Sequence, residues 1–229
     1  MHIIVDKRIP FEAKIKLKKF GEVLFFETSG ITYPAISGHP DIFFCKTENE
    51  LVIAPNTPGK TIEQLKVSNI SFVTGKKIVG TQYPQTAYYN ALITDRYLVH
   101  NLNYTDPVIL DFCDHLEKID LKQAYTRCSV LAFGNDSYIT SDKGIEKVLL
   151  KCGLAVLFVN PKGILLPGFE HGFFGGTCGI YKDKVFFTGS LDRFPEGEKV
   201  RQFMSGYEII ELYDGPLFDG GSLIFLNHT

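Results

Sequence analysis

Apolar and polar positions follow a repeating order along the chain, in which two short strands precede one helix and a third strand. Four hairpins can be read directly, each with two β-prone runs on either side of a short polar turn. They cover residues 42–53, 91–99, 129–139 and 179–187. Val, Ile, Leu, Phe and Tyr predominate on both sides of these turns, so each hairpin predicts two antiparallel strands.

After each hairpin the pattern changes from the period of a strand to that of a helix. Residues suited to a helix N-cap come first, as at Thr105-Asp106 and Ser141-Asp142. In the third helix, Ile145, Val148 and Leu149 share one face. The predicted helices cover 61–67, 108–118, 144–152 and 196–205. Each leads into an apolar strand, at 70–73, 118–121, 155–159 and 208–212.

A fifth unit is divided between the two ends of the chain. Residues 222–226 predict a lone C-terminal strand. The N-terminal segment supplies the rest of the unit: a strand at 2–5, a helix at 11–20 and a strand at 22–26. Pairing of both termini in one sheet would close the ring and leave no free edge there. The repeat therefore predicts a single α/β domain over residues 1–229, a pseudo-fivefold propeller of strand–strand–helix–strand units. An ordinary α/β sandwich with hairpins is the alternative.

Composition narrows the classes of function. The formal net charge is −2, so the chain has no basic excess for non-specific binding to nucleic acid. The N-terminus lacks the pattern of a signal peptide, and the longest apolar stretch, 154–159, is too short to cross a bilayer. The five cysteines have no zinc-site spacing, and their odd number favours reduced thiols. We therefore expect a cytoplasmic protein with no metal or cofactor that binds neither nucleic acid nor membrane.

A ring of five such units, with the last completed by the N-terminus, resembles the pentein fold. That fold is the α/β propeller of guanidino-group-modifying enzymes: arginine deiminase, agmatine deiminase, dimethylarginine hydrolase and arginine–glycine amidinotransferase. The glycine-rich segments 164–179 and 219–226 are similar to those that lead into the inner strands of the family. In its details the chain is most similar to an uncharacterised bacterial family with this fold. The resemblance covers the whole chain and implies a polar central site for a small molecule.

The resemblance also implies a type of reaction. These enzymes attack the guanidinium carbon with a cysteine, use a histidine as acid or base, and hold the cation with carboxylates. In members similar to agmatine deiminase, the cysteine follows a C-terminal Gly-Gly by a few positions. Here Phe225 stands at that distance after Gly220-Gly221, and no cysteine occurs after Cys178. This departure argues against the usual deiminase mechanism.

Other residues could carry chemistry in the same fold. His39-Pro40-Asp41 is similar to the family's His-x-Asp, although it lies in the first complete unit rather than in a later one. His39 is therefore a candidate acid or base, and Asp41 a candidate cation holder. Cys128 and Cys178 precede inner strands of two other units, and either could be a nucleophile with His39 or His171 as its base. A buried, unreactive thiol is the alternative for both.

Further polar residues are expected to contact a ligand near the ring axis. They stand before inner strands or in the glycine-rich connectors: Asn90, His171, Asp219 and Ser222. Asp219 could equally accept backbone N–H bonds in a tight turn, and His171 could simply be solvated. Two functions stay open, namely a divergent hydrolase or transferase for a guanidino or amino-acid-like molecule, or a non-catalytic binding or interaction protein. The small-molecule ligand and the oligomeric state are not determined by the sequence.

Overall fold

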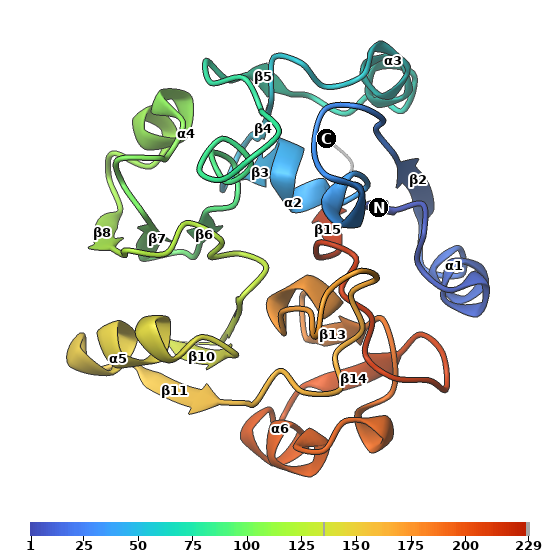
Figure 1. Cartoon of the computed structure of the whole chain (residues 1–229), viewed down its shortest axis with the longest axis vertical. Helices are drawn as coiled ribbons and strands as arrows, with labels where there is room; N and C mark the ends of the chain where they lie inside the picture. Colours follow the sequence, from blue (N-terminus) through green and yellow to red (C-terminus); the bar gives the residue numbers. More distant parts are fainter. Residues whose placement is uncertain (135, 228–229) are drawn as a thin grey trace.

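The computed structural model describes residues 1–134 and 136–227, which form a ring of five small sheets (Figure 1). Each sheet has an inner strand antiparallel to a middle strand, which in turn pairs parallel with an outer strand. Four sheets are β3 (Phe44–Lys46), β4 (Leu51–Ile53) and β5 (Val73–Thr74); β6 (Leu92–Ile93), β7 (Tyr97–His100) and β8 (Glu117–Asp120); β9 (Val130–Phe133), β10 (Ser137–Thr140) and β11 (Ala155–Phe158); and β12 (Cys178–Tyr181), β13 (Lys184–Phe187) and β14 (Glu208–Glu211).

The two ends of the chain share the fifth sheet. Its strands are β15 (Ile224–Leu226), β1 (His2–Asp6) and β2 (Glu22–Phe26). β15 pairs antiparallel with β1, with Ile3 opposite Phe225, and β1 pairs parallel with β2. In Figure 1 the red strand β15 accordingly lies beside the blue N-terminal segment. The predicted closure of the ring is confirmed, and with it the pseudo-fivefold α/β propeller.

One helix connects the middle strand to the outer strand in every unit. These helices are α1 (Phe11–Leu17), α3 (Gly59–Val67), α4 (Pro107–Phe112), α5 (Lys143–Lys151) and α6 (Gly197–Phe203). Asp106 and Asp142 cap α4 and α5, because their carboxylates accept the first free backbone N–H groups. The predicted helices at 11–20, 108–118 and 196–205 extend past the observed ends. Short 3₁₀ turns precede the next elements at η1 (Pro34–Ile36), η2 (Gly175–Thr177) and η3 (Leu191–Arg193).

The first hairpin begins differently from its prediction. The strand expected from residue 42 begins only at Phe44, because a single helical turn, α2 (Pro40–Phe43), precedes it. Pro40 stands at the first helical position, where its fixed φ suits a helix and its missing N–H has no cost. The turn brings Asp41 to the ring axis, at the start of the inner strand.

Hydrophobic clusters fill the spaces between neighbouring sheets. Side chains of one strand alternate between two clusters: in β9, Leu131 and Phe133 contact the sheet that follows, whereas Val130 contacts the sheet before it. Both faces of these strands are therefore buried, which explains their nearly continuous apolar sequence. Among the described residues, no helix has the length and apolar character needed to cross a membrane.

Candidate functional site

Buried polar side chains gather where the inner strands begin. Ser222 Oγ lies 2.7 Å from Oδ2 of Asp41 and 3.1 Å from the Gly175 carbonyl oxygen. Asn90 donates from Nδ2 to the Asp41 carbonyl oxygen at 3.2 Å and accepts the backbone N–H of Cys128 at Oδ1. Asp41 is 1% exposed, and its Oδ1 has no hydrogen-bond partner. The structure thus brings together residues from all five units, next to a carboxylate that has one unpartnered oxygen.

A histidine between two carboxylates lies beside this group. His39 Nδ1 is 3.9 Å from Asp219 Oδ1, and its Nε2 is 4.0 Å from Asp6 Oδ2. Asp219 also accepts backbone N–H bonds from Phe173 at 2.8 Å and from Gly221 at 3.0 Å. Asp219 therefore accepts backbone N–H bonds in a tight turn and also lies beside His39. We call Asp6, His39, Asp41, Cys128 and Asp219 the axial cluster.

Glycines make room for the axial cluster. A Cβ at Gly176 would lie 2.0 Å from Asp219 Oδ1, and a Cβ at Gly221 would lie 2.2 Å from the Cβ of His39. Gly221 also has a φ of +67°, which side chains other than glycine rarely adopt. The glycine-rich connectors thus allow the backbone to approach the charged side chains closely.

Burial shifts the charge state of the axial cluster. It raises the pKa of Asp41 to about 6, against the hydrogen bond from Ser222. It raises the pKa of Asp219 to about 7, and the charge of Asp41 adds to this effect. Burial lowers the pKa of His39 to about 4, although the charge of Asp6 opposes that shift. The imidazole is therefore neutral at pH 7, and both carboxyl groups titrate closer to neutrality than usual.

The two candidate cysteines lie in different surroundings. Cys178 belongs to the hydrophobic cluster between its own sheet and the preceding one, where it packs with Phe174 and Phe187. Cys128 is also buried but belongs to none of the hydrophobic clusters, and burial together with the charges of Asp41 and Asp219 raises the pKa of its thiol. Of the two predicted nucleophiles, only Cys128 belongs to the axial cluster.

Aromatic side chains from the loops before the inner strands form ring contacts with one another. Tyr33, Tyr83, Tyr125, Phe169 and Phe173 make up this aromatic cover. The pKa of Tyr33 is raised by burial and by the charges of Cys128, Asp219 and Asp41, so the cover lies next to the axial cluster. His171 contacts Phe173 and its own neighbour Gly172, and thus belongs with the cover rather than with the cluster.

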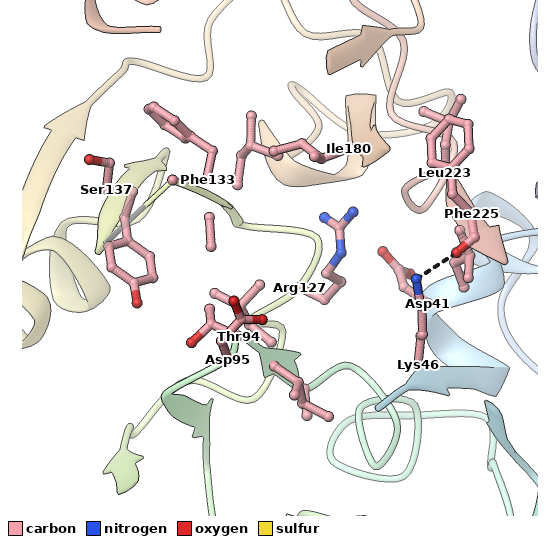
Figure 2. A pocket seen from close by; sticks show the side chains of 18 of the residues that line it. Asp41, Lys46, Thr94, Asp95, Arg127, Phe133, Ser137, Ile180, Leu223 and Phe225 are labelled. Carbon is pink, nitrogen blue, oxygen red and sulfur yellow. Dashed lines mark hydrogen bonds between the residues drawn. The ribbon is translucent and has the colours of Figure 1, made fainter. Parts of the chain in front are cut away.

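A cavity of about 700 Å³ occupies the ring axis on the side of the hairpin turns (Figure 2). Asp41 and Arg127 line its inner end, and Thr94, Asp95 and Lys182 line its rim. We call it the channel cavity. Its lining does not include His39, Cys128 or Asp219, so the channel cavity and the axial cluster meet at Asp41.

Several residues of the site have no counterpart among the sequence predictions. Asp6 ends the first strand, and Arg8 binds it through a 2.5 Å contact between Nη2 and Oδ2. Arg127 lies directly before Cys128 and reaches the ring axis. A charged residue at the end of an apolar strand, as in His2–Asp6, is the signal that could have identified Asp6. Within the described residues, no group of three or more His, Cys, Asp or Glu side chains could hold a metal ion.

Comparison with known proteins agrees with the architecture. A family model described as a family of unknown function, DUF6873, matches residues 4–224. The chain belongs to this family. No curated protein matches it.

Solved structures of guanidino-modifying enzymes are similar to the chain in fold. DDAH from Pseudomonas aeruginosa, solved with citrulline, has a TM-score of 0.54 and 7% identity, over 92% of this chain and 91% of that one. Agmatine deiminase from C. jejuni has a TM-score of 0.58 and 8% identity, over 92% and 86%. SxtG, an amidinotransferase of the saxitoxin pathway from Microseira wollei, has a TM-score of 0.53 and 11% identity, over 92% and 87%. The resemblance to the pentein fold is confirmed, and identities this low show the fold alone.

Proposed function

We propose that this member of DUF6873 binds a small molecule with a planar cationic group at the axial cluster, and that Cys128 attacks that group. The proposed ligand is a guanidino or amino-acid-like compound, and the proposed reaction is hydrolysis or group transfer. One observation carries the proposal: a buried thiol lies within electrostatic reach of two buried carboxylates, Asp41 and Asp219. Such carboxylates suit a guanidinium, which pairs best with planar anions.

The same charges explain why the thiol would react only in the presence of its ligand. Burial and the two carboxylates oppose ionisation of Cys128, so the free protein holds it as a thiol. A cation between Asp41 and Asp219 would cancel their charge and favour the thiolate. The unpartnered Oδ1 of Asp41 is an acceptor available for a ligand N–H.

His39 is the proposed acid and base. Its lowered pKa keeps the imidazole neutral at pH 7, and Asp6 and Asp219 on either side would stabilise the imidazolium once a proton is transferred to it. In the proposed step, the Cys128 sulfur–carbon bond forms and the carbon–nitrogen bond of the ligand breaks. The thiol proton passes through His39 to the departing amine. Water or a second amine would then release the product from the sulfur, giving hydrolysis or transfer respectively.

A non-catalytic binding protein is the second candidate, and Phe225 favours it. This residue stands where related enzymes are expected to carry their cysteine, and it is 2% exposed in the cluster between the fourth and fifth sheets. No reactive group is therefore available at that position. Without a reaction at Cys128, the axial cluster would still offer two carboxylates to a cationic ligand.

A pair of alkylating reagents tests the proposal. Chloroacetamidine carries a planar cation, whereas chloroacetamide is a neutral molecule of nearly the same shape. We expect chloroacetamidine to label Cys128 at least about tenfold faster than chloroacetamide, because only the cation pairs with the carboxylates. The exposed Cys152 is the internal control and should show no such preference. Labelling is measured by peptide mass spectrometry in the native protein and in Asp219→Asn, which should lose the preference.

Thermal shift measurements separate the two candidates. Arginine, agmatine and methylarginines are compared with neutral amino acids. If a guanidino compound stabilises the fold but Cys128 is not labelled selectively, the result favours the non-catalytic binding protein. If no guanidino compound stabilises the fold, the proposed ligand class is wrong.

A further inference from the structure

Two cations line the channel cavity without forming an ion pair to any carboxylate of the described residues. Arg127 donates from Nη1 to the Gly175 carbonyl oxygen and from Nη2 to the Cys178 carbonyl oxygen, each at 3.2 Å. Lys46 donates to the Phe225 carbonyl oxygen at 2.8 Å, drawn as the dashed line in Figure 2.

Both cations keep donors free for a ligand. A guanidinium has five N–H groups and an ammonium has three, so the described protein acceptors leave three donors on Arg127 and two on Lys46. Lys46 is partly exposed to solvent, and burial of the rest of its side chain lowers its pKa. Incompletely bonded cations in such surroundings favour an anion as their partner.

The walls of the channel cavity are apolar above this charged end. Phe133, Ile180 and Leu223 line it, as Figure 2 shows. Charged and polar residues return at the rim, where Arg96 is already paired with Glu117. The cavity therefore offers cationic donors at its inner end, hydrocarbon along its length and water at its mouth. Its volume of about 700 Å³ lies within the range of small-molecule sites.

Asp41 sets the net charge that a ligand meets. With Asp41 ionised, Lys46, Arg127 and Asp41 of the cavity lining together carry one net positive charge, and the charge of Arg127 acts on the Asp41 carboxylate. A single carboxylate neutralises that charge, whereas a dianion would exceed it. An apolar body on the carboxylate would fill the space between the walls.

We propose that the channel cavity is a binding site for a small monocarboxylate with an apolar body, held at its carboxylate by Arg127 and Lys46. This site opens at the hairpin turns and does not include Cys128; it shares Asp41 with the axial cluster but needs no reaction there. A cation at the axial cluster and an anion in the channel cavity would approach Asp41 from opposite sides.

Calorimetric titration of the full chain with 3-phenylpropionate tests the site. We expect saturable binding that 3-phenylpropionamide, its uncharged counterpart, does not show. Lys46→Gln keeps a donor for the Phe225 carbonyl but loses the charge, and should weaken binding roughly tenfold or more. Arg127→Gln should weaken it further, and Lys182→Gln at the rim is the matched control with less than about a twofold effect. Asp41→Asn removes the opposing carboxylate and should tighten binding.

The outcomes against the proposal are equally definite. Equal binding of 3-phenylpropionamide, or an unchanged affinity in Lys46→Gln with the fold intact by circular dichroism, would overturn it. Tighter binding of phenylalanine than of 3-phenylpropionate would replace the monoanion with a zwitterion and so refute the assigned ligand class. Chloroacetamidine labelling of Cys128 tests only the axial cluster, so failure of either proposal is recognised separately.

Discussion

Asp219 should make the protein less stable as the pH rises towards neutrality. Burial raises its pKa from 3.8 to about 7, which means that the folded chain binds this proton more tightly than the unfolded chain does. The resulting stabilisation is complete below pH 3.8 and is lost as the pH rises through about 7. At ~1.4 kcal/mol per pH unit, the full contribution is about 4 kcal/mol. About 3 kcal/mol of it should disappear between pH 4.5 and 7.5.

Asp219→Asn isolates this contribution, since asparagine has the shape of the protonated acid and does not titrate. The free energy of unfolding is measured by urea titration for both proteins at several pH values from 4.5 to 7.5. We expect the native protein to lose its advantage over the variant as the pH rises, by an amount equivalent to a relative shift of roughly 10 °C in Tm.

Two comparisons make the result interpretable. His39 acts in the opposite direction, because burial lowers its pKa from 6.5 to about 4. Its stabilisation is complete above pH 6.5 and is lost as the pH falls through about 4. His39 is retained in both proteins, so the difference between them reports on Asp219 together with its coupling to His39. Asp142→Asn removes one carboxylate at an accessible helix cap and controls for the loss of charge alone. A difference between native protein and Asp219→Asn that stays constant with pH would refute the reasoning.

Three further substitutions follow from the packing. Gly176→Ala should lower Tm by several degrees, because the new Cβ would overlap Asp219 Oδ1. Gly59→Ala, at an open helix start, should leave Tm unchanged or raise it. Equal changes in Tm would contradict the close approach of the Gly176 backbone to Asp219. Asp142→Ala should cost about 1 kcal/mol in urea unfolding, since two backbone N–H groups lose their acceptor, and Asp142→Asn should restore most of it. Phe225→Cys should destabilise by roughly 3 kcal/mol, because the ring packs in the cluster between the fourth and fifth sheets. The new thiol should show no preference for chloroacetamidine, since Phe225 borders the channel cavity rather than the axial cluster, and selective labelling there would contradict this placement.

The repeat, the ring closure and the N-caps could be predicted because each depends on short-range pattern. Pro40 shows the limit of that approach. Ile42 and Phe43 look like a β-strand, yet the proline at the first helical position starts a turn instead. The spacing of apolar residues predicts that a helix or a strand forms. It does not decide between a short helix and a short strand over the same residues, because that choice depends on tertiary contacts.

The positions of several site residues follow from the sequence, whereas their chemical roles stay predictions. Asp41, Asn90, Cys128 and Ser222 were expected near the axis because each stands at the start of an inner strand, and they do come together. The position of Cys178 between two sheets could not be predicted, since alternation along a strand does not say which side chains face which neighbour. Asp6 stands at the end of an apolar strand and Arg127 shortly before an inner strand, and which ligand-facing role each has depends on how the five units meet at the axis.

The way the sheets pack explains why the candidate chemistry lies at the two ends of the ring axis. Both faces of most strands pack into the hydrophobic clusters between neighbouring sheets, so few strand positions can carry polar side chains that bind a ligand. The segments that lead into the inner strands carry Asp41 and Asp219 of the axial cluster, and Arg127 and Lys46 line the channel cavity. The charge of the side chains along the axis therefore changes from negative in the axial cluster to positive in the channel cavity, with Asp41 between the two. Because a planar cation and an organic anion would meet this carboxylate from opposite ends, Asp41→Asn should weaken one ligand and strengthen the other, an outcome that a single undivided pocket would not produce.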